Sequence, residues 1–195
     1  MKRLVLVRHG ETDWSAAGRH TGRTDVPLTT RGEEVARALG HRLEQLGVVP
    51  VGCLSSPRRR AVDTARLAGL GPDLVVDHRL VELDYGEYEG KTTAEVRRER
   101  PSWDLFTDGC PGGETFPAAG ARADDLLSDL APEGGEGDVV LVGHGHFSRI
   151  LAARYLGLGP EQARLLALGT ASISVLGHEH EWRALLLWNH TGGCP

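Results

Sequence analysis

The sequence has 195 residues, enough for one sizeable domain with its own core and too few for two full domains. It carries 22 Lys and Arg against 27 Asp and Glu, and this net charge of −5 argues against a nucleic-acid-binding domain, which is usually basic. The apolar run at residues 4–7 is far too short for a signal peptide or a membrane span. We therefore expect one domain over residues 1–195, located in the cytoplasm, with neither nucleic acid nor membrane as a partner.

The first half of the chain alternates short apolar runs, typical of buried strands, with apolar residues at helical spacing. In chain order we expect a strand at residues 3–7, a helix from a capping box at 30–33 to Gly47, a strand at 51–55, a helix from the N-cap Ser56 and Pro57 to about residue 67, and a short strand at 74–76.

The second half begins with a long irregular stretch and then returns to the same alternation. In chain order we expect one or two short helices within residues 84–117, a helix over 118–130, a turn at 132–137, a strand at 139–142, a helix after 145, and a hairpin of 171–176 with 184–188. Strands that alternate with helices predict an α/β fold with a mostly parallel central sheet and helices on both faces.

Chemically reactive side chains follow three of the expected strands. Arg8-His9-Gly10 ends the first strand, the segment 55–60 follows the second, and Gly143-His144-Gly145 ends the strand at 139–142. Ligands of open α/β sheets bind beyond the carboxyl ends of the strands, so we expect these segments to meet. His9 is a candidate nucleophile, because a neutral imidazole can form a covalent intermediate and the glycine after it lets a ligand approach the backbone. The alternative to a shared site is that His9 and His144 are two unrelated residues in turns.

Charged residues beside these segments suit an anionic ligand. The arginines at 58–60 begin an expected helix, where the helix dipole already places positive charge, so an anion nearby would be favourable. Successive helical residues point about 100° apart, so the three cannot all face one site, and a solvated charge run is the alternative for some of them. Glu82 stands between apolar neighbours, a setting that suits a proton-transferring carboxyl, with an exposed Glu as the alternative.

Metal sites and disulfides have little support in the sequence. Its nine histidines form no HExxH motif and no Cys/His grid, and the alternating pairs His144/His146 and His178/His180 more often have structural or solvent roles. The three cysteines are odd in number and widely spaced, which indicates free thiols in a reducing compartment. We therefore expect no metal site and no cofactor.

The motifs resemble those of the histidine phosphatase superfamily, also called phosphoglycerate mutase-like. Its hallmark, Arg-His-Gly followed by Glu, reads here Arg8-His9-Gly10-Glu11. Further matching blocks follow in family order at residues 18–22, 24–29, 55–61, 82–90 and 142–145. The resemblance covers nearly the whole chain, and the set of blocks is far more specific than Arg-His-Gly alone.

The resemblance implies a role for each matching residue. His9 would accept the phosphoryl group, Arg8, Arg60 and His144 would hold the phosphate oxygens, and Glu82 would give a proton to the leaving oxygen. Arg60 is selected from the three arginines because the family's second arginine precedes an alanine three residues before Thr-Ala. The substrate contacts implied beyond these are Ser15, Thr21, Gly22, Tyr85 and Gly145. Ser15 is a departure, because many members carry Asn at that position.

The activity that the resemblance implies is hydrolysis of small phosphomonoesters, such as sugar phosphates or bisphosphates, through a phosphohistidine and without a metal. The segments 14–22 and 110–114 are most similar to a subgroup of acid phosphatases and sedoheptulose bisphosphatase-like enzymes. Residues 84–117 are expected to form a lid. Six acidic residues of this segment indicate a polyhydroxy product and disfavour a carboxylate-bearing one, although most of them are expected to face solvent: Asp84, Glu87, Glu89, Asp104, Asp108 and Glu114.

The main alternative is a cofactor-dependent phosphoglycerate mutase. The lysine that such mutases place after the Tyr-Gly block would fall near Thr93, and their arginine pair has no counterpart between Phe106 and Phe116. His146 stands where they carry Asn. A third alternative, an inactive binding module on the same fold, is disfavoured because all five core residues are present. The sequence leaves the physiological substrate open, and also the oligomeric state, with a homodimer as one option.

Overall fold

The computed structural model describes residues 3–130 and 137–192. Its core is a six-stranded sheet in the order β3-β2-β4-β1-β5-β6. The parallel strands are β1 (Arg3–Arg8), β2 (Pro50–Ser55), β3 (Leu74–Val76) and β4 (Asp138–Gly143). The hairpin β5 (Ile173–Glu179) and β6 (Trp182–His190) adds two antiparallel strands beside β1. The α/β fold with a mostly parallel sheet is thus confirmed, whereas the turn expected at 132–137 lies almost entirely outside the described residues.

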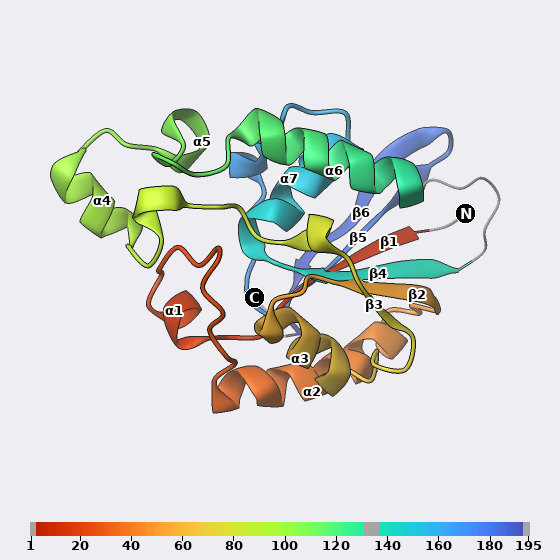
Figure 1. Cartoon of the computed structure of the whole chain (residues 1–195). Coiled ribbons are helices and arrows are strands. Elements are labelled where there is room, and N and C mark those ends of the chain that lie inside the picture. The colour runs from red at the N-terminus through yellow and green to blue at the C-terminus, as the bar shows by residue number, and fades with distance from the viewer. Residues whose placement is uncertain (1–2, 131–136, 193–195) are drawn as a thin grey trace.

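Helices cover both faces of the sheet, as expected (Figure 1). On one face lie α2 (Thr30–Gln45) and α3 (Arg59–Leu67), and on the other α6 (Phe116–Leu130) and α7 (Gly145–Tyr155). Alternate residues of β1 enter the two cores, so that Val5 packs in the α2 and α3 layer while Leu6 packs in the α6 and α7 layer. This double burial is the reason that β1 reads as a continuous apolar run. No helix in the described part of the chain combines the length and the apolar character needed to cross a bilayer.

Short elements gather beyond the carboxyl ends of the parallel strands (Figure 1). They are α1 (Asp13–Ala16), the 3₁₀ turns η1 (His78–Leu80), η2 (Gly86–Tyr88) and η3 (Pro160–Leu165), and the helices α4 (Thr93–Glu99) and α5 (Leu105–Asp108). The two short helices expected within 84–117 are thus present as α4 and α5. They extend outward from the sheet on the same side as α1, which makes room for a pocket between them.

Two predicted helix starts were wrong. The N-cap of α2 is Thr29, whose hydroxyl accepts from Gly32 N at 2.9 Å, so the N-cap lies one residue before Thr30, where the expected capping box begins. The N-cap of α3 is Arg58, without a side-chain cap. Instead, Asp25 accepts from Arg59 N at 2.8 Å and satisfies a free N–H of the first turn from across the chain. A cap supplied from 34 residues away leaves no local signal near residue 56.

Candidate active site

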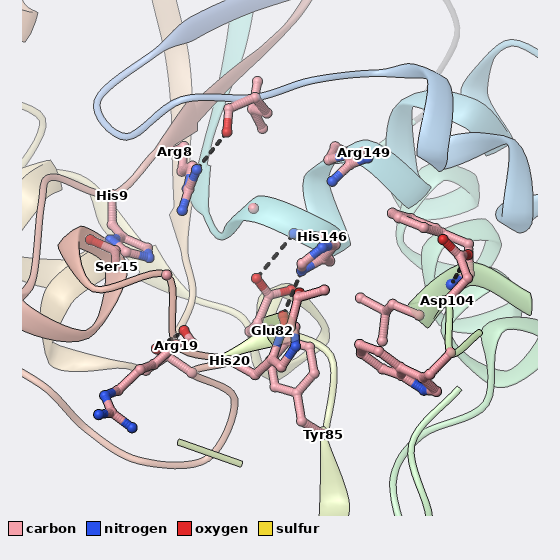
Figure 2. Close-up of a pocket in the computed structure, with 18 of the residues that line it drawn as sticks. Arg8, His9, Ser15, Arg19, His20, Glu82, Tyr85, Asp104, His146 and Arg149 are labelled. Carbon is pink, nitrogen blue, oxygen red and sulfur yellow. Dashed lines mark hydrogen bonds between the residues drawn. The ribbon is translucent and has the colours of Figure 1, made fainter. Parts of the chain in front are cut away.

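A cavity of about 290 Å³ opens beyond the carboxyl ends of β1 and β4. Figure 2 shows Arg8, His9 and Ser15 on one side of it and Asp104 on the other, with Glu82 and His146 between them. The lid contributes part of the lining, namely Tyr85, Thr93, Arg97 and residues 103–106. Two of the three predicted strand-end segments, 8–10 and 143–145, reach this pocket together with the irregular segment, whereas no residue of the segment 55–60 lines it.

His9 lines this cavity with its ring orientation fixed. The side chain is 4% exposed, and its Nδ1 lies 2.7 Å from Gly10 O, which can only accept a hydrogen bond. Nδ1 therefore carries the proton and Nε2 keeps a lone pair. Burial, followed by the charges of Arg60 and Arg8, holds the pKa of His9 well below its usual value, so the imidazole is neutral.

Gly10 is needed for a different reason than the sequence suggested. A Cβ at this position would lie 2.6 Å from Gly32 O, so the glycine permits close packing of the β1 end on α2. The expectation that it makes room for a ligand was wrong. Gly10 N donates to Thr64 Oγ1 at 2.9 Å, which fixes the backbone beside His9 to α3.

His144 and Arg60 are fully buried next to His9, outside the cavity lining. The rings of His9 and His144 have centroids 5.2 Å apart, and Arg60 Nε donates to His144 Nδ1 at 3.2 Å. His144 Nε2 therefore carries the proton and donates to Ser56 Oγ at 2.7 Å. Burial and then Arg60 hold the pKa of His144 well below its usual value.

Of the three consecutive arginines, Arg60 turns inward and Arg59 turns outward. Arg59 is exposed and pairs with Asp63 at 3.1 Å, which confirms that the three do not share one site. The terminal nitrogens of Arg60 donate to Thr24 O at 2.8 Å and Thr21 O at 3.0 Å. Arg60 thereby fixes the loop after α1 against α3.

The guanidinium of Arg8 presents positive charge to the cavity and has few hydrogen-bond partners. Its Nη1 donates to Leu168 O, while its buried Nε has no partner among the described residues. Burial lowers the pKa of Arg8, which reflects the cost of removing a guanidinium from water. Gly145 gives this group its space, because a Cβ there would lie 3.3 Å from Arg8 Cζ. An anion in the cavity would supply the missing partner.

Glu82 is buried, at 8% exposure, and its carboxylate is held by three backbone N–H groups. Oε1 accepts from Leu83 N at 2.9 Å and from Phe147 N at 2.8 Å, and Oε2 accepts from His146 N at 3.0 Å. Two of these donors belong to the first turn of α7, whose N–H groups have no partner within the helix. The alternative of an exposed Glu82 is thereby excluded.

The predicted substrate contacts divide into those that reach the cavity and one that does not. Ser15, Thr21, Tyr85 and Gly145 line it. Gly22 does not: its N–H donates to both carboxylate oxygens of Glu89 at 3.0 Å. The predicted substrate contact at Gly22 is therefore not part of this lining, and a carboxylate 67 residues away in sequence accepts from its N–H.

The family follows from the match over the whole chain. A family model described as "Histidine phosphatase superfamily (branch 1)" matches residues 4–191. The chain belongs to this superfamily.

Individual members of the histidine phosphatase superfamily are also similar in sequence and fold. An acid phosphatase of Mycobacterium tuberculosis is 43% identical over 190 residues, covering 97% of this chain and 93% of that protein. The sedoheptulose 1,7-bisphosphatase of Saccharomyces cerevisiae is 35% identical over 190 residues, covering 82% of this chain and 69% of the yeast protein. A solved mycobacterial glucosyl-3-phosphoglycerate phosphatase in complex with vanadate (VO3) is 32% identical, with a TM-score of 0.87 and coverage of 97% and 100%. The resemblance and its subgroup are thus confirmed.

Several lining residues of this histidine phosphatase were missed from the sequence. They are Arg19, His20, Arg97, His146 and Arg149. Their spacing carried a signal, because positions 146 and 149 lie one helical turn apart directly after the His144 motif. Tyr85 OH and His146 Nδ1 share a hydrogen bond of 2.6 Å. Burial raises the pKa of the phenol and lowers that of the imidazole, so both groups are neutral.

The interpretation of the lid as an acidic surface toward the substrate was wrong. Of the six acidic residues named for it, only Asp104 lines the cavity. Asp84 pairs with Arg23 and Glu114 with Arg122, so their charges are already neutralised. The lining instead contains the arginines at positions 8, 19, 97 and 149 against two carboxylates, and is basic. Across residues 3–130 and 137–192, no three His, Cys, Asp or Glu side chains gather as metal ligands would.

Proposed function

We propose that this histidine phosphatase hydrolyses small phosphomonoesters through a phosphoryl group carried on His9. The observation that carries the proposal is the tautomer of His9. Its Nδ1 proton is fixed on Gly10 O at 2.7 Å, so Nε2 holds a lone pair at the cavity beside the incompletely paired Arg8. A neutral, oriented imidazole next to a buried cation is suited to accept a phosphoryl group.

The first chemical step transfers the phosphoryl group to the enzyme. His9 Nε2 forms a bond to phosphorus while the bond from phosphorus to the ester oxygen breaks. Glu82, in its carboxylic acid form, gives its proton to that leaving oxygen, and the alcohol departs. Arg8 offsets the charge on the phosphoryl oxygens. His144 Nε2–H donates to Ser56 Oγ at 2.7 Å, so it would hold a phosphate oxygen by exchanging Ser56 for that oxygen as its acceptor, with Arg60 beside it.

The second step returns the enzyme to its starting state. Water attacks the phosphorus of the phosphohistidine, Glu82 takes a proton from that water, and the bond to His9 Nε2 breaks. Inorganic phosphate leaves and the imidazole regains its lone pair. The same carboxyl thus serves as acid in one step and as base in the other, which the three backbone N–H bonds permit by holding it in one place.

The wall of the cavity favours sugar phosphates or bisphosphates as substrates. Arg149 stacks on the Phe106 ring at 4.7 Å and donates to Ala163 O at 3.0 Å, and neither contact neutralises its charge. The neutral ring of His146 lines the cavity, and His20 has a buried Nε2 without a partner in the described structure. Hydroxyl groups and a second anionic group would fit this lining. The names of the two curated relatives, an acid phosphatase and a sedoheptulose bisphosphatase, support the same class.

A phosphoglycerate mutase is the second candidate, because a basic wall can also hold a carboxylate. Against it stands Thr93, which lines the cavity near the position where the resemblance places a mutase lysine. A mutase must also shield its phosphohistidine from water until the product is rephosphorylated. Without a lysine at Thr93 to bind the product carboxylate, we expect the alcohol to leave and the phosphohistidine to be hydrolysed.

One experiment separates the two activities. The protein is given 3-phosphoglycerate with 2,3-bisphosphoglycerate, and separately a panel of sugar phosphates and bisphosphates, while isomerisation and free phosphate are both followed. We expect phosphate release from the sugar esters to dominate. Isomerisation much faster than phosphate release would overturn the phosphatase and establish the mutase.

A reducing, cytoplasmic location is part of the proposal. Cys53 is buried and Cys110 is half-buried, and both are free thiols, while Cys194 lies outside the described residues. Burial raises the pKa of each described thiol to about 12, which keeps it protonated and unreactive at neutral pH.

Light scattering on the purified protein would decide between a monomer and the homodimer left open by the sequence.

A further inference from the structure

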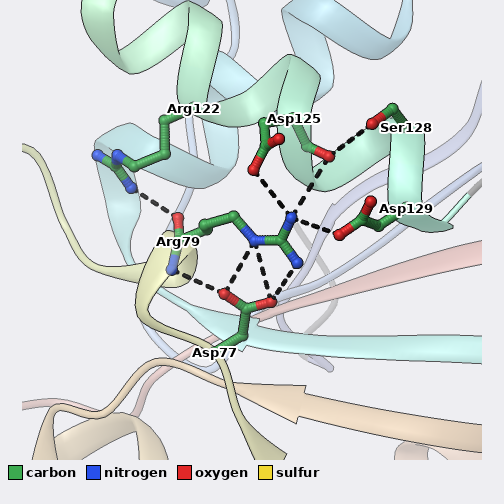
Figure 3. A network of polar contacts seen from close by, with 6 residues as sticks. All are labelled: Asp77, Arg79, Arg122, Asp125, Ser128 and Asp129. Carbon is green, nitrogen blue, oxygen red and sulfur yellow. Dashed lines mark hydrogen bonds and ion pairs between the residues drawn. The ribbon is translucent and has the colours of Figure 1, made fainter.

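Arg122, in the middle of α6, binds the backbone that leads directly into Glu82. Its Nη1 donates to Arg79 O at 2.7 Å and to Val81 O at 2.9 Å. Figure 3 shows the guanidinium of Arg122 pointing to the carbonyl of Arg79. Val81 is the residue immediately before Glu82, so this one group fixes the plane of the peptide that joins them.

The same guanidinium also packs on the residue that holds the carboxylate of Glu82. Its Cζ lies 3.9 Å from the centre of the Phe147 ring, which is 1% exposed. Phe147 N donates to Glu82 Oε1 at 2.8 Å. Arg122 therefore supports Glu82 from both ends, through its backbone at Val81 and through the donor of its carboxylate at Phe147.

The remaining N–H groups of Arg122 bind the lid. Nε donates to Glu114 Oε1 at 3.0 Å and Nη2 to Glu114 Oε2 at 2.6 Å, a two-point pair with both side chains below 20% exposure. Glu114 N in turn donates to Asp84 O at 2.9 Å, two residues after Glu82. The chain segments on either side of Glu82 are thus tied to one guanidinium.

Attachment of α6 to this region does not depend on Arg122 alone. Figure 3 shows Arg79 of η1 between Asp77, Asp125 and Asp129, with nitrogen-to-oxygen distances of 2.8, 2.9 and 2.6 Å. Two of these carboxylates belong to α6. Loss of the Arg122 guanidinium would therefore leave η1 bound to the helix and affect chiefly the peptide at Val81, the Phe147 ring and Glu114.

We propose that Arg122 is a positioning residue that holds the carboxyl of Glu82 at the leaving oxygen. The inference rests on the proposed role of Glu82 as the proton donor. Its consequence is specific: removing Arg122 should slow the step that needs a proton, and should spare substrates whose leaving group departs without one.

The test compares Arg122→Met, Arg122→Lys and Glu82→Gln on two substrates, an alkyl phosphate and 4-nitrophenyl phosphate. Arg122→Met should lower kcat/KM, which reports the phosphoryl-transfer step, by about tenfold to a hundredfold for the alkyl phosphate, the effect of misplacing a catalytic group by a fraction of an ångström. The kcat/KM for the aryl phosphate should change little. Arg122→Lys keeps the positive charge but not the two-point hydrogen bonding of the guanidinium. Its activity on the alkyl phosphate should lie between those of Arg122→Met and the unmodified protein. The matched control is Asp124→Asn, which removes another α6 ion pair, to Arg154 at 2.9 Å, and should show no leaving-group dependence.

The double variant Glu82→Gln, Arg122→Met completes the test. If Arg122 acts through Glu82, the double variant loses no more activity on the alkyl phosphate than Glu82→Gln alone. An equal loss on both substrates, or additive losses, would overturn the role of Arg122 while leaving Glu82 intact. If Glu82→Gln itself lacks leaving-group dependence, the proton donor is another residue and the inference fails with it. Thermal melting identifies a variant that does not fold, in which case Arg122→Lys decides.

Discussion

The rings of His9 and His144 lie edge to face with centroids 5.2 Å apart, and they carry their protons on opposite nitrogens. Parallel pairing of β1 and β4 brings them together, since Arg8 is in register with Gly143 and His9 N donates to Gly143 O at 2.9 Å. His9 keeps a lone pair on Nε2, while the Nε2–H of His144 donates to Ser56 Oγ at 2.7 Å. In the proposed mechanism the first ring bonds to phosphorus, and the second binds a phosphate oxygen once that oxygen replaces Ser56 as the acceptor.

A phosphoryl group on His9 should be trapped during turnover. Rapid quenching with labelled substrate should give an adduct at His9 that is labile in acid and stable in base, as expected for a phosphorus–nitrogen bond. His9→Ala should abolish both the adduct and the activity. Full activity of His9→Ala would exclude the covalent route, and an adduct at another residue would move the nucleophile there.

Turnover should continue without a divalent metal. Arg8 already places a guanidinium at the cavity, so the phosphoryl charge can be offset by the chain itself. Chelator should leave kcat unchanged, and vanadate, which mimics five-coordinate phosphorus, should inhibit. Activity that disappears in chelator and returns with one added metal would contradict this prediction.

Glu82→Gln should slow the hydrolysis of alkyl phosphates far more than that of aryl phosphates. Gln cannot give up a proton, and removing general acid catalysis costs about a hundredfold to ten-thousandfold when the leaving oxygen is basic. The ratio of kcat/KM on the two substrate classes is the measurement, because kcat/KM reports phosphoryl transfer and excludes the later hydrolysis of the phosphohistidine, in which Glu82 acts as base. A loss of the same size on both classes would show that Glu82 does not protonate the leaving group.

The central sheet and the strand-end site were predictable because they depend on local patterns. Buried parallel strands read as apolar runs, and the reactive residues stand directly after them, as His9 and His144 do. The start of α3 was not predictable, because its first-turn N–H is capped by Asp25 from a distant loop. A local motif search has no access to such a partner.

The prediction of the charge of the pocket was wrong for the same reason. From sequence, the lid counts as acidic, but Glu114 is neutralised by Arg122 of α6 and Asp84 by Arg23. Arg149 enters the pocket from α7 and, with the arginines at positions 8, 19 and 97, makes the lining basic. Which charges face a ligand is decided by pairings between distant segments, and composition within one segment does not report it.

The free energy of unfolding should fall as the pH drops below about 6.5, the usual pKa of histidine in an unfolded chain. Burial holds the pKa values of His9, His144 and His146 well below this in the folded protein, so the unfolded chain binds protons that the folded one does not. Stability is then complete above the unfolded pKa and is lost progressively below it. Asp138, whose pKa is lowered in the fold, adds to this loss only below about pH 4.

Urea unfolding across this pH range measures the effect. His146→Gln removes one of the three imidazoles whose pKa values are held well below the usual value, so its stability should depend less steeply on pH than that of the unmodified protein. The exposed His41 provides the matched control, and His41→Gln should leave the slope unchanged. A stability that is constant from neutral pH down to about pH 5, well below the usual histidine pKa, would show that the buried rings take up protons without cost.

Arg149→Gln should separate substrates by their number of anionic groups. The half-buried guanidinium stacks on Phe106 at 4.7 Å and lines the cavity with its charge uncompensated by its two contacts. A charge-assisted hydrogen bond to a second phosphate is worth about 1.5 to 3 kcal/mol, so the variant should raise KM for a sugar bisphosphate by about tenfold or more. A sugar monophosphate has no second phosphate that Arg149 could bind, so its KM should change by less than about twofold on the same reasoning. The exposed Arg164 is a matched control, and Arg164→Gln should affect neither KM. If Arg149→Gln weakens both substrates equally, Arg149 contributes general positive charge to the pocket and does not select bisphosphates.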